Sequence, residues 1–105
     1  MFRESGISWT GRRFIGEVDG YFVEAQVFDE PSSYGIAKGR ISHLYVYPDH
    51  SSDFNRRLLG YERGWEGGPP QDRRLQRVVE QAVNYFDRQP VDWMFEMYRY
   101  RDSRD

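Results

Sequence analysis

The chain has 105 residues with 15 basic and 17 acidic side chains, and this near balance argues against a broad electrostatic attraction to nucleic acid. Cysteine is absent, which excludes disulfides and thiolate chemistry, and no apolar run reaches the ~18 residues of a membrane-spanning helix. The N-terminus has no signal-peptide core. We therefore expect a soluble, cytoplasmic protein that does not bind membranes, folded as a single domain over residues 1–105.

The first half of the chain predicts strands. We expect a frayed start over residues 1–6 and a first possible strand opening at Trp9. Residues 12–18 alternate weakly and residues 21–28 alternate cleanly between apolar and polar side chains. Asp19-Gly20 between them is typical of a type I′ turn, which needs positive φ at both central positions. These signals predict a β-hairpin.

A long link follows the hairpin and leads into a further predicted strand over residues 40–47. Residues 29–39 are rich in proline, serine and glycine, the residues that build turns. Because the link is too long for a two-residue hairpin turn, we expect an ordered loop with its own contacts, where binding residues can collect. Residues 54–61 are predicted as a fourth strand, at an edge or with a bulge, because their arginines and leucines come in pairs.

The second half predicts one main helix. Residues 62–70 cross over as a loop, and over residues 71–87 apolar side chains recur at helical spacing. The apolar positions are Leu75, Val78, Val79, Ala82, Val83 and Phe86. We expect this stripe to pack on one face of the sheet, which gives an α+β fold with an antiparallel meander of four to five strands.

The C-terminal extension, residues 89–101, fits two structures. As a strand it places Val91, Trp93 and Phe95 on one face, and its aromatic residues favour this interpretation. As a helix it would begin at Asp92 as the N-cap. We place the folded core at about residues 9–88 and expect disorder at 102–105.

Several short motifs occur in a fixed order: VDGY at 18–21, VFDEPS at 27–32, YGI at 34–36, GRIS at 39–42 and YERGW at 61–65. In this order they resemble a small, uncharacterised domain family of bacterial phages and mobile elements, over roughly residues 14–87. The resemblance implies a compact α+β domain without an established activity, cofactor or catalytic residue. Small phage proteins of this kind often bind and inhibit a host factor, so it also implies a protein partner.

The candidate partner-binding residues are aromatic and arginine side chains in the loop and the extension, a composition typical of protein-binding hot spots. They are Tyr34, Arg40, Trp93, Tyr98, Arg99, Tyr100 and Arg101. The alternative is that the aromatic residues of the extension complete the core. An exposed strand edge would also allow a homodimer.

Other side-chain groups support weaker alternatives. Asp29, Glu30 and His43 could form an acid–base site if they converge. Asp49, His50 and Asp53 could hold a metal, but their spacing fits a solvated turn better. Arginine clusters at 12–13, 56–57 and 73–77 could bind single-stranded nucleic acid if they shared a face with aromatic rings.

The sequence therefore predicts a non-enzymatic, protein-binding accessory factor of phage or mobile-element origin, with inhibition of a host defence protein as a candidate role. No cofactor, metal or catalytic residue is assigned. A nucleic-acid-binding accessory protein and a small enzyme are the alternatives.

Overall fold

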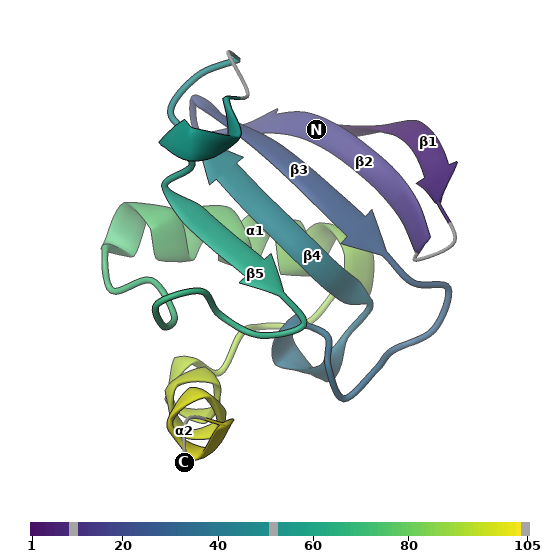
Figure 1. Ribbon diagram of the computed structural model, residues 1–105. Coiled ribbons are helices and arrows are strands. Elements are labelled where there is room, and N and C mark those ends of the chain that lie inside the picture. The colour runs from purple at the N-terminus through teal and green to yellow at the C-terminus, as the bar shows by residue number, and fades with distance from the viewer. Residues whose placement is uncertain (9–10, 51–52, 104–105) are drawn as a thin grey trace.

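The computed structural model describes residues 1–8, 11–50 and 53–103. Over these residues the chain forms one antiparallel sheet in the order β1-β2-β3-β4-β5 and two α-helices (Figure 1). The elements are β1 Phe2–Ser8, β2 Gly11–Val18, β3 Tyr21–Val27, β4 Ile41–Tyr47, β5 Leu59–Glu62, α1 Arg73–Asp87 and α2 Trp93–Ser103. The predicted α+β meander with one main helix on one face is confirmed.

The β2–β3 hairpin has the predicted turn. Asp19 and Gly20 take φ values of 52° and 86°, and Val18 pairs directly with Tyr21. Both central residues thus have the positive φ that a type I′ turn requires.

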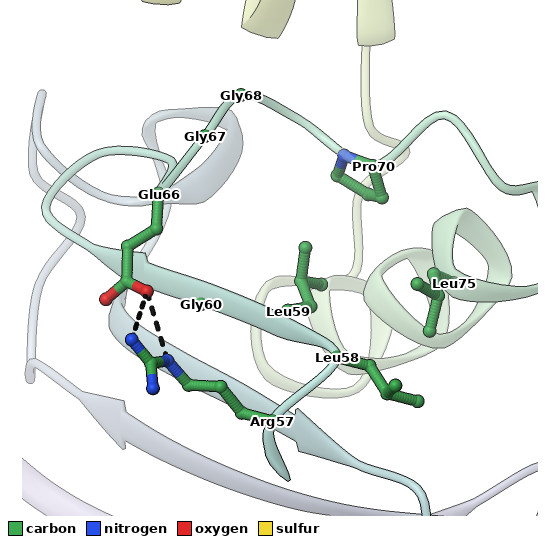
Figure 2. Close-up of a pocket in the computed structure, with 9 residues that line it drawn as sticks. All are labelled: Arg57, Leu58, Leu59, Gly60, Glu66, Gly67, Gly68, Pro70 and Leu75. Carbon is green, nitrogen blue, oxygen red and sulfur yellow. Dashed lines mark hydrogen bonds and ion pairs between the residues drawn. The ribbon is translucent and has the colours of Figure 1, made fainter. Parts of the chain in front are cut away.

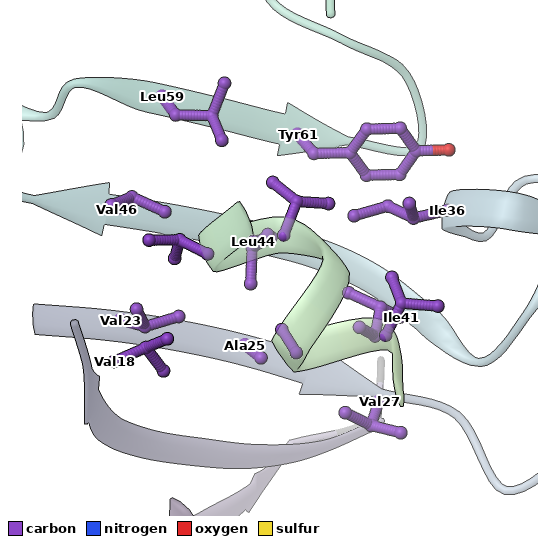
Figure 3. Close-up of a cluster of buried hydrophobic side chains, with 14 of the residues drawn as sticks. Val18, Val23, Ala25, Val27, Ile36, Ile41, Leu44, Val46, Leu59 and Tyr61 are labelled. Carbon is purple, nitrogen blue, oxygen red and sulfur yellow. The ribbon is translucent and has the colours of Figure 1, made fainter. Parts of the chain in front are cut away.

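The core lies between α1 and the sheet face that it covers (Figure 3). Alternate residues of β3 point into it, as the sequence predicts: Val23, Ala25 and Val27 are buried. The helix contributes Val78, Val79, Ala82 and Val83, all fully buried. Each such valine stabilises the fold by about 1.5–3 kcal/mol relative to an exposed one.

Helix α1 begins two residues later than predicted, because Asp72 serves as its N-cap. The Asp72 Oδ1 atom accepts a hydrogen bond from the Arg74 backbone N–H at 2.8 Å. At the other end Arg88 takes the left-handed conformation, with φ of 53°, and its N–H donates to the Asn84 carbonyl. Both ends therefore have capping partners for free backbone groups.

The N-terminal residues are not frayed, so that prediction is wrong. β1 pairs with β2 from Phe2 to Ser8, with a register shift between Glu4 and Gly6. The Phe2 ring packs on Tyr85 and Phe86 of α1, with ring centroids 5.2 and 5.0 Å apart. This long-range contact gives no local sequence signal. Trp9, where a strand was predicted to open, lies outside the described residues.

The fourth strand is shorter than predicted. Residues Phe54–Arg56 form a 3₁₀ turn, and β5 covers only Leu59–Glu62. The turn forms because the Asp53 Oδ1 atom accepts a hydrogen bond from the Asn55 N–H at 3.0 Å. Such a local side-chain bond offers the backbone an alternative to strand pairing.

The extension forms a helix, so the preference for a strand is wrong and the alternative is confirmed. The Asp92 Oδ1 atom caps α2 by accepting a hydrogen bond from the Phe95 N–H at 3.1 Å. Asp102 and Ser103 belong to α2, which contradicts the predicted disorder for these two residues. Neither α1 nor α2, the α-helices of the described residues, has the length and apolar character that crossing a bilayer requires.

The long loop is ordered, as predicted, and is fastened to α1. Its ends meet where the Ser32 N–H donates to the Gly39 carbonyl at 3.0 Å. The Asp87 carboxylate accepts a hydrogen bond from the Arg40 backbone N–H at 3.1 Å and lies 3.5 Å from the Arg40 Nε atom. Gln89 donates to the Ala37 carbonyl at 3.0 Å. The loop therefore has a fixed position next to α2.

Gly39 lies where a side chain has no room. A Cβ atom there would lie 2.2 Å from Oδ2 of Asp87. We expect Gly39→Ala to lower the free energy of unfolding by about 1–3 kcal/mol in urea denaturation, because it displaces the Asp87 carboxylate. Gly64→Ala is the control, since no atom lies within 4 Å of its added Cβ. Equal losses in the two variants would contradict this prediction.

Candidate protein-binding surface

Helix α2 is fastened to the body of the protein through a buried carboxylate. The Glu96 side chain is 0% exposed, and its Oε1 atom accepts hydrogen bonds from the Trp65 indole at 3.0 Å and from Arg99 at 3.1 Å. A second indole bond runs from Trp93 to Glu80 of α1 at 2.7 Å. Trp65 also packs edge-on against the Tyr61 ring, at 4.8 Å between centroids. Trp65 therefore packs at the junction of helix and sheet, and Glu96 is its hydrogen-bond partner there.

Arg99 joins α2 to the long loop and to β5. It donates to the Ser33 carbonyl at 3.1 Å and to the Tyr61 hydroxyl. That hydroxyl in turn donates to the Tyr34 carbonyl at 2.6 Å. Three segments distant in sequence are thus held together by one guanidinium group.

Burial raises the pKa of Glu96 above its ordinary value of 4.5, although Arg99 and the Trp65 indole act in the opposite direction. The Glu96 Oε2 atom has no hydrogen-bond partner in the described part of the chain. The folded protein therefore holds the Glu96 proton more tightly than the unfolded chain does.

This pKa shift predicts a pH-dependent contribution to stability. Between pH 4.5 and the raised pKa the folded state binds more protons than the unfolded state, so the stability from Glu96 falls as the pH rises through this window. Glu96→Gln removes this titration but keeps an acceptor for Trp65 and Arg99. We expect the stability of the variant relative to the native protein to increase from pH 4 to pH 7 in urea denaturation. A pH-independent difference would contradict the raised pKa.

The outer side of α2 exposes large apolar side chains next to the loop. Met94 is 84% exposed and Tyr98, one turn later, is 66% exposed. Tyr34 of the loop is 61% exposed, and Arg101 is exposed one further turn along α2. We call these four residues the α2–loop surface. Tyrosine and arginine are enriched at binding hot spots.

The predicted partner-binding residues divide into two groups. Tyr34, Tyr98 and Arg101 are exposed, as a binding role requires. The others make internal contacts that position α2 or the loop: Arg40 with Phe86 and Asp87, Trp93 with Glu80, Arg99 with Glu96, and Tyr100 with the core. Met94 and Glu96 are not among the predicted residues, because the exposure of one and the burial of the other follow only from the helical spacing that the Asp92 cap indicates.

A separate cavity of about 490 Å³ opens between β5 and the start of α1 (Figure 2). Leu58, Leu59, Pro70 and Leu75 form its apolar lining, and Gly67 and Gly68 lie at its border. The Arg57 guanidinium there is already paired with Glu66 at 3.0 Å.

The residues of the predicted acid–base site do not come together. His43 contacts the Ser42 hydroxyl at 3.0 Å, and burial lowers its pKa. Asp29 and Glu30 are exposed in the loop, and no hydrogen bond or ion pair joins either to His43 within the described residues.

The other polar groups are likewise dispersed. His50 pairs with Glu17 at 2.7 Å, Asp49 lies 3.6 Å from Arg56, and Asp53 caps its own turn. Residues 1–8, 11–50 and 53–103 contain no cluster of three or more potential metal ligands.

The arginine clusters are each paired with local carboxylates. The pairs are Arg12–Glu4, Arg13–Glu24, Arg56–Asp49, Arg57–Glu66, Arg73–Glu80 and Arg74–Asp72. Such pairing reduces the positive field that nucleic-acid binding would need.

Comparison with known proteins identifies a family but no activity. A family model described as "Domain of unknown function (DUF7678)" matches residues 12–87, which is more than half of the chain. No curated protein and no solved structure matches. β1 and α2 flank the matched region, which contains β2 to β5 and α1. The chain therefore belongs to the DUF7678 family.

Proposed function

We propose that the protein is a non-enzymatic, protein-binding accessory factor that contacts its partner through the α2–loop surface. The observation that carries this proposal is the exposure of Met94, Tyr98 and Tyr34 on two adjoining segments. A soluble protein that exposes neighbouring large apolar side chains commonly uses them for association.

The hydrogen bonds beneath the α2–loop surface hold α2 in a fixed position, and this order favours binding. Arg99 and Glu96 fasten α2 to Trp65, Tyr61 and the loop. The helix also rests on the loop where Lys38 lies 4.9 Å from the centre of the Phe95 ring. A surface that is ordered before binding loses less conformational entropy on association.

The resemblance to phage and mobile-element domains suggests the kind of partner. We propose that the protein acts in the cytoplasm of a bacterial host and inhibits a host defence protein. In this proposal residues 12–87 are the scaffold shared with the family, and α2, which follows them, supplies the contact.

Affinity capture of the tagged protein from host lysate, with and without nuclease, tests the proposal. We expect a stoichiometric protein partner that survives nuclease. Partners that disappear on nuclease treatment would instead support the nucleic-acid alternative. Recovery of the tagged protein alone would contradict the proposal and direct attention to self-association.

A further inference from the structure

A small cavity of about 130 Å³ lies next to the α2–loop surface. Its lining comprises Ser33, Arg63, Gly64, Trp65, Arg99 and Tyr100, which places two guanidinium groups beside two aromatic rings. We propose that this cavity receives a carboxylate side chain of the protein partner, so that the bound segment of the partner is acidic. This inference rests on the proposed function and specifies the partner's chemistry.

Arg63 supplies a charge without a partner. Its side chain is exposed and makes no hydrogen bond or ion pair in the described part of the chain. The carboxylates on both sides of it are engaged elsewhere: Glu62 accepts from the Tyr45 hydroxyl, and Glu66 pairs with Arg57 at 3.0 Å. Within the described residues neither carboxylate forms an ion pair with Arg63, so its guanidinium is free to pair with a carboxylate of the partner.

The backbone at Arg63 is also unusual. Its φ is 58°, in the left-handed region of backbone conformation that residues other than glycine rarely adopt. The Arg63 N–H donates to the Ser42 carbonyl at 2.9 Å, which holds this conformation in place. Residues in such conformations concentrate at binding sites, where the surrounding structure maintains them.

Arg99 offers the second guanidinium in a fixed orientation. Three of its N–H groups donate to Ser33, Tyr61 and Glu96. A guanidinium carries five N–H groups, so two of them have no acceptor in the described residues. Arg99 therefore retains donors for a further oxygen.

The balance of charge and shape favours a carboxylate over a phosphate. Glu96 offsets part of the Arg99 charge, so the excess at the cavity comes mainly from Arg63. One excess charge matches a carboxylate better than a phosphate group, which carries about −1.5 to −2 at pH 7. Guanidinium forks also fit the plane of a carboxylate, and the Trp65 and Tyr100 rings can pack on its methylene stem.

Titration of the ¹⁵N-labelled protein with N-acetyl-glutamate N-methylamide, at constant ionic strength, tests the inference. We expect this capped glutamate to shift the NMR signals of the Trp65 indole and the Gly64 amide, and the capped glutamine to leave them unchanged. Equal shifts with both compounds would overturn the inference, as would stronger binding of inorganic phosphate. This titration uses the native protein, so its outcome does not depend on whether a variant folds.

Arg63→Gln should weaken binding of the capped glutamate by about tenfold or more, because it removes charge-assisted hydrogen bonds. Arg77→Gln is the matched control, since Arg77 is exposed on α1 and belongs neither to the cavity lining nor to the α2–loop surface. Equal binding in the two variants would overturn the inference.

The captured partner separates this inference from the proposed function. If Tyr98→Ala loses the partner while Arg63→Gln retains it fully, the α2–loop surface binds and the cavity inference fails. If Tyr98→Ala retains the partner, the proposed surface itself is wrong. Loss of the partner in both variants, with retention of the partner in Arg77→Gln, supports both.

Discussion

Replacement of Glu96 by alanine is expected to lower the free energy of unfolding by about 3–5 kcal/mol, as for other buried charge pairs that lose one member. The variant leaves the buried indole of Trp65 and part of the Arg99 guanidinium without an acceptor. It also removes the side chain that joins α2 to the body of the protein. Urea denaturation followed by tryptophan fluorescence measures the loss.

Glu80→Ala is a matched control for this prediction. Glu80 likewise accepts hydrogen bonds from an indole, that of Trp93, and from an arginine, Arg73, but it is partly exposed. Water can replace its bonds, so we expect a loss of about 1 kcal/mol. If Glu96→Ala is no more destabilising than Glu80→Ala, the buried carboxylate is not the anchor of α2.

Tyr98→Ala is expected to weaken partner binding about 30-fold or more, the effect of removing a hot-spot tyrosine. The side chain is 66% exposed, so the free energy of unfolding should change by no more than about 0.5 kcal/mol. Isothermal titration calorimetry with the captured partner measures the affinity.

Tyr85→Ala is the control for Tyr98→Ala, because Tyr85 is a tyrosine of α1 that is 49% exposed and outside the α2–loop surface. It should bind the partner with unchanged affinity. Similar losses in the two variants would show that the effect does not come from the proposed surface.

The sequence predicts those elements whose signals are local. The Asp19-Gly20 turn requires only the conformational freedom of two residues, and α1 is visible as an apolar stripe at helical spacing. Both are confirmed. The sheet order equals the chain order, because strands that are consecutive in sequence commonly pair as neighbours.

The elements that the sequence mispredicts depend on distant contacts or on local caps. β1 forms because Phe2 packs on Tyr85 and Phe86 of α1, which lie more than 80 positions later in the chain. α2 forms because the Asp92 cap starts a helix and Glu96 is buried against Trp65, although aromatic residues intrinsically favour strands. Tertiary contacts override propensity in both elements.

The candidate surface could be predicted only in part for the same reason. Residue type selected Tyr34, Tyr98 and Arg101, which are exposed in the structure, but the same criterion also selected Arg40 and Arg99, which make internal bonds. Arginine and aromatic side chains can either form contacts inside the protein or bind another protein. Only the structure, which shows which of them make internal contacts, separates the two roles.

Hydrogen exchange of the protein alone and in complex with its captured partner tests the central claim most directly. If the α2–loop surface is the contact, exchange slows on binding at residues 32–38 and 93–103, and the β1 to β3 strands remain unchanged. Protection confined to the β1 edge or to the sheet face opposite α1, with none in α2, would contradict the claim.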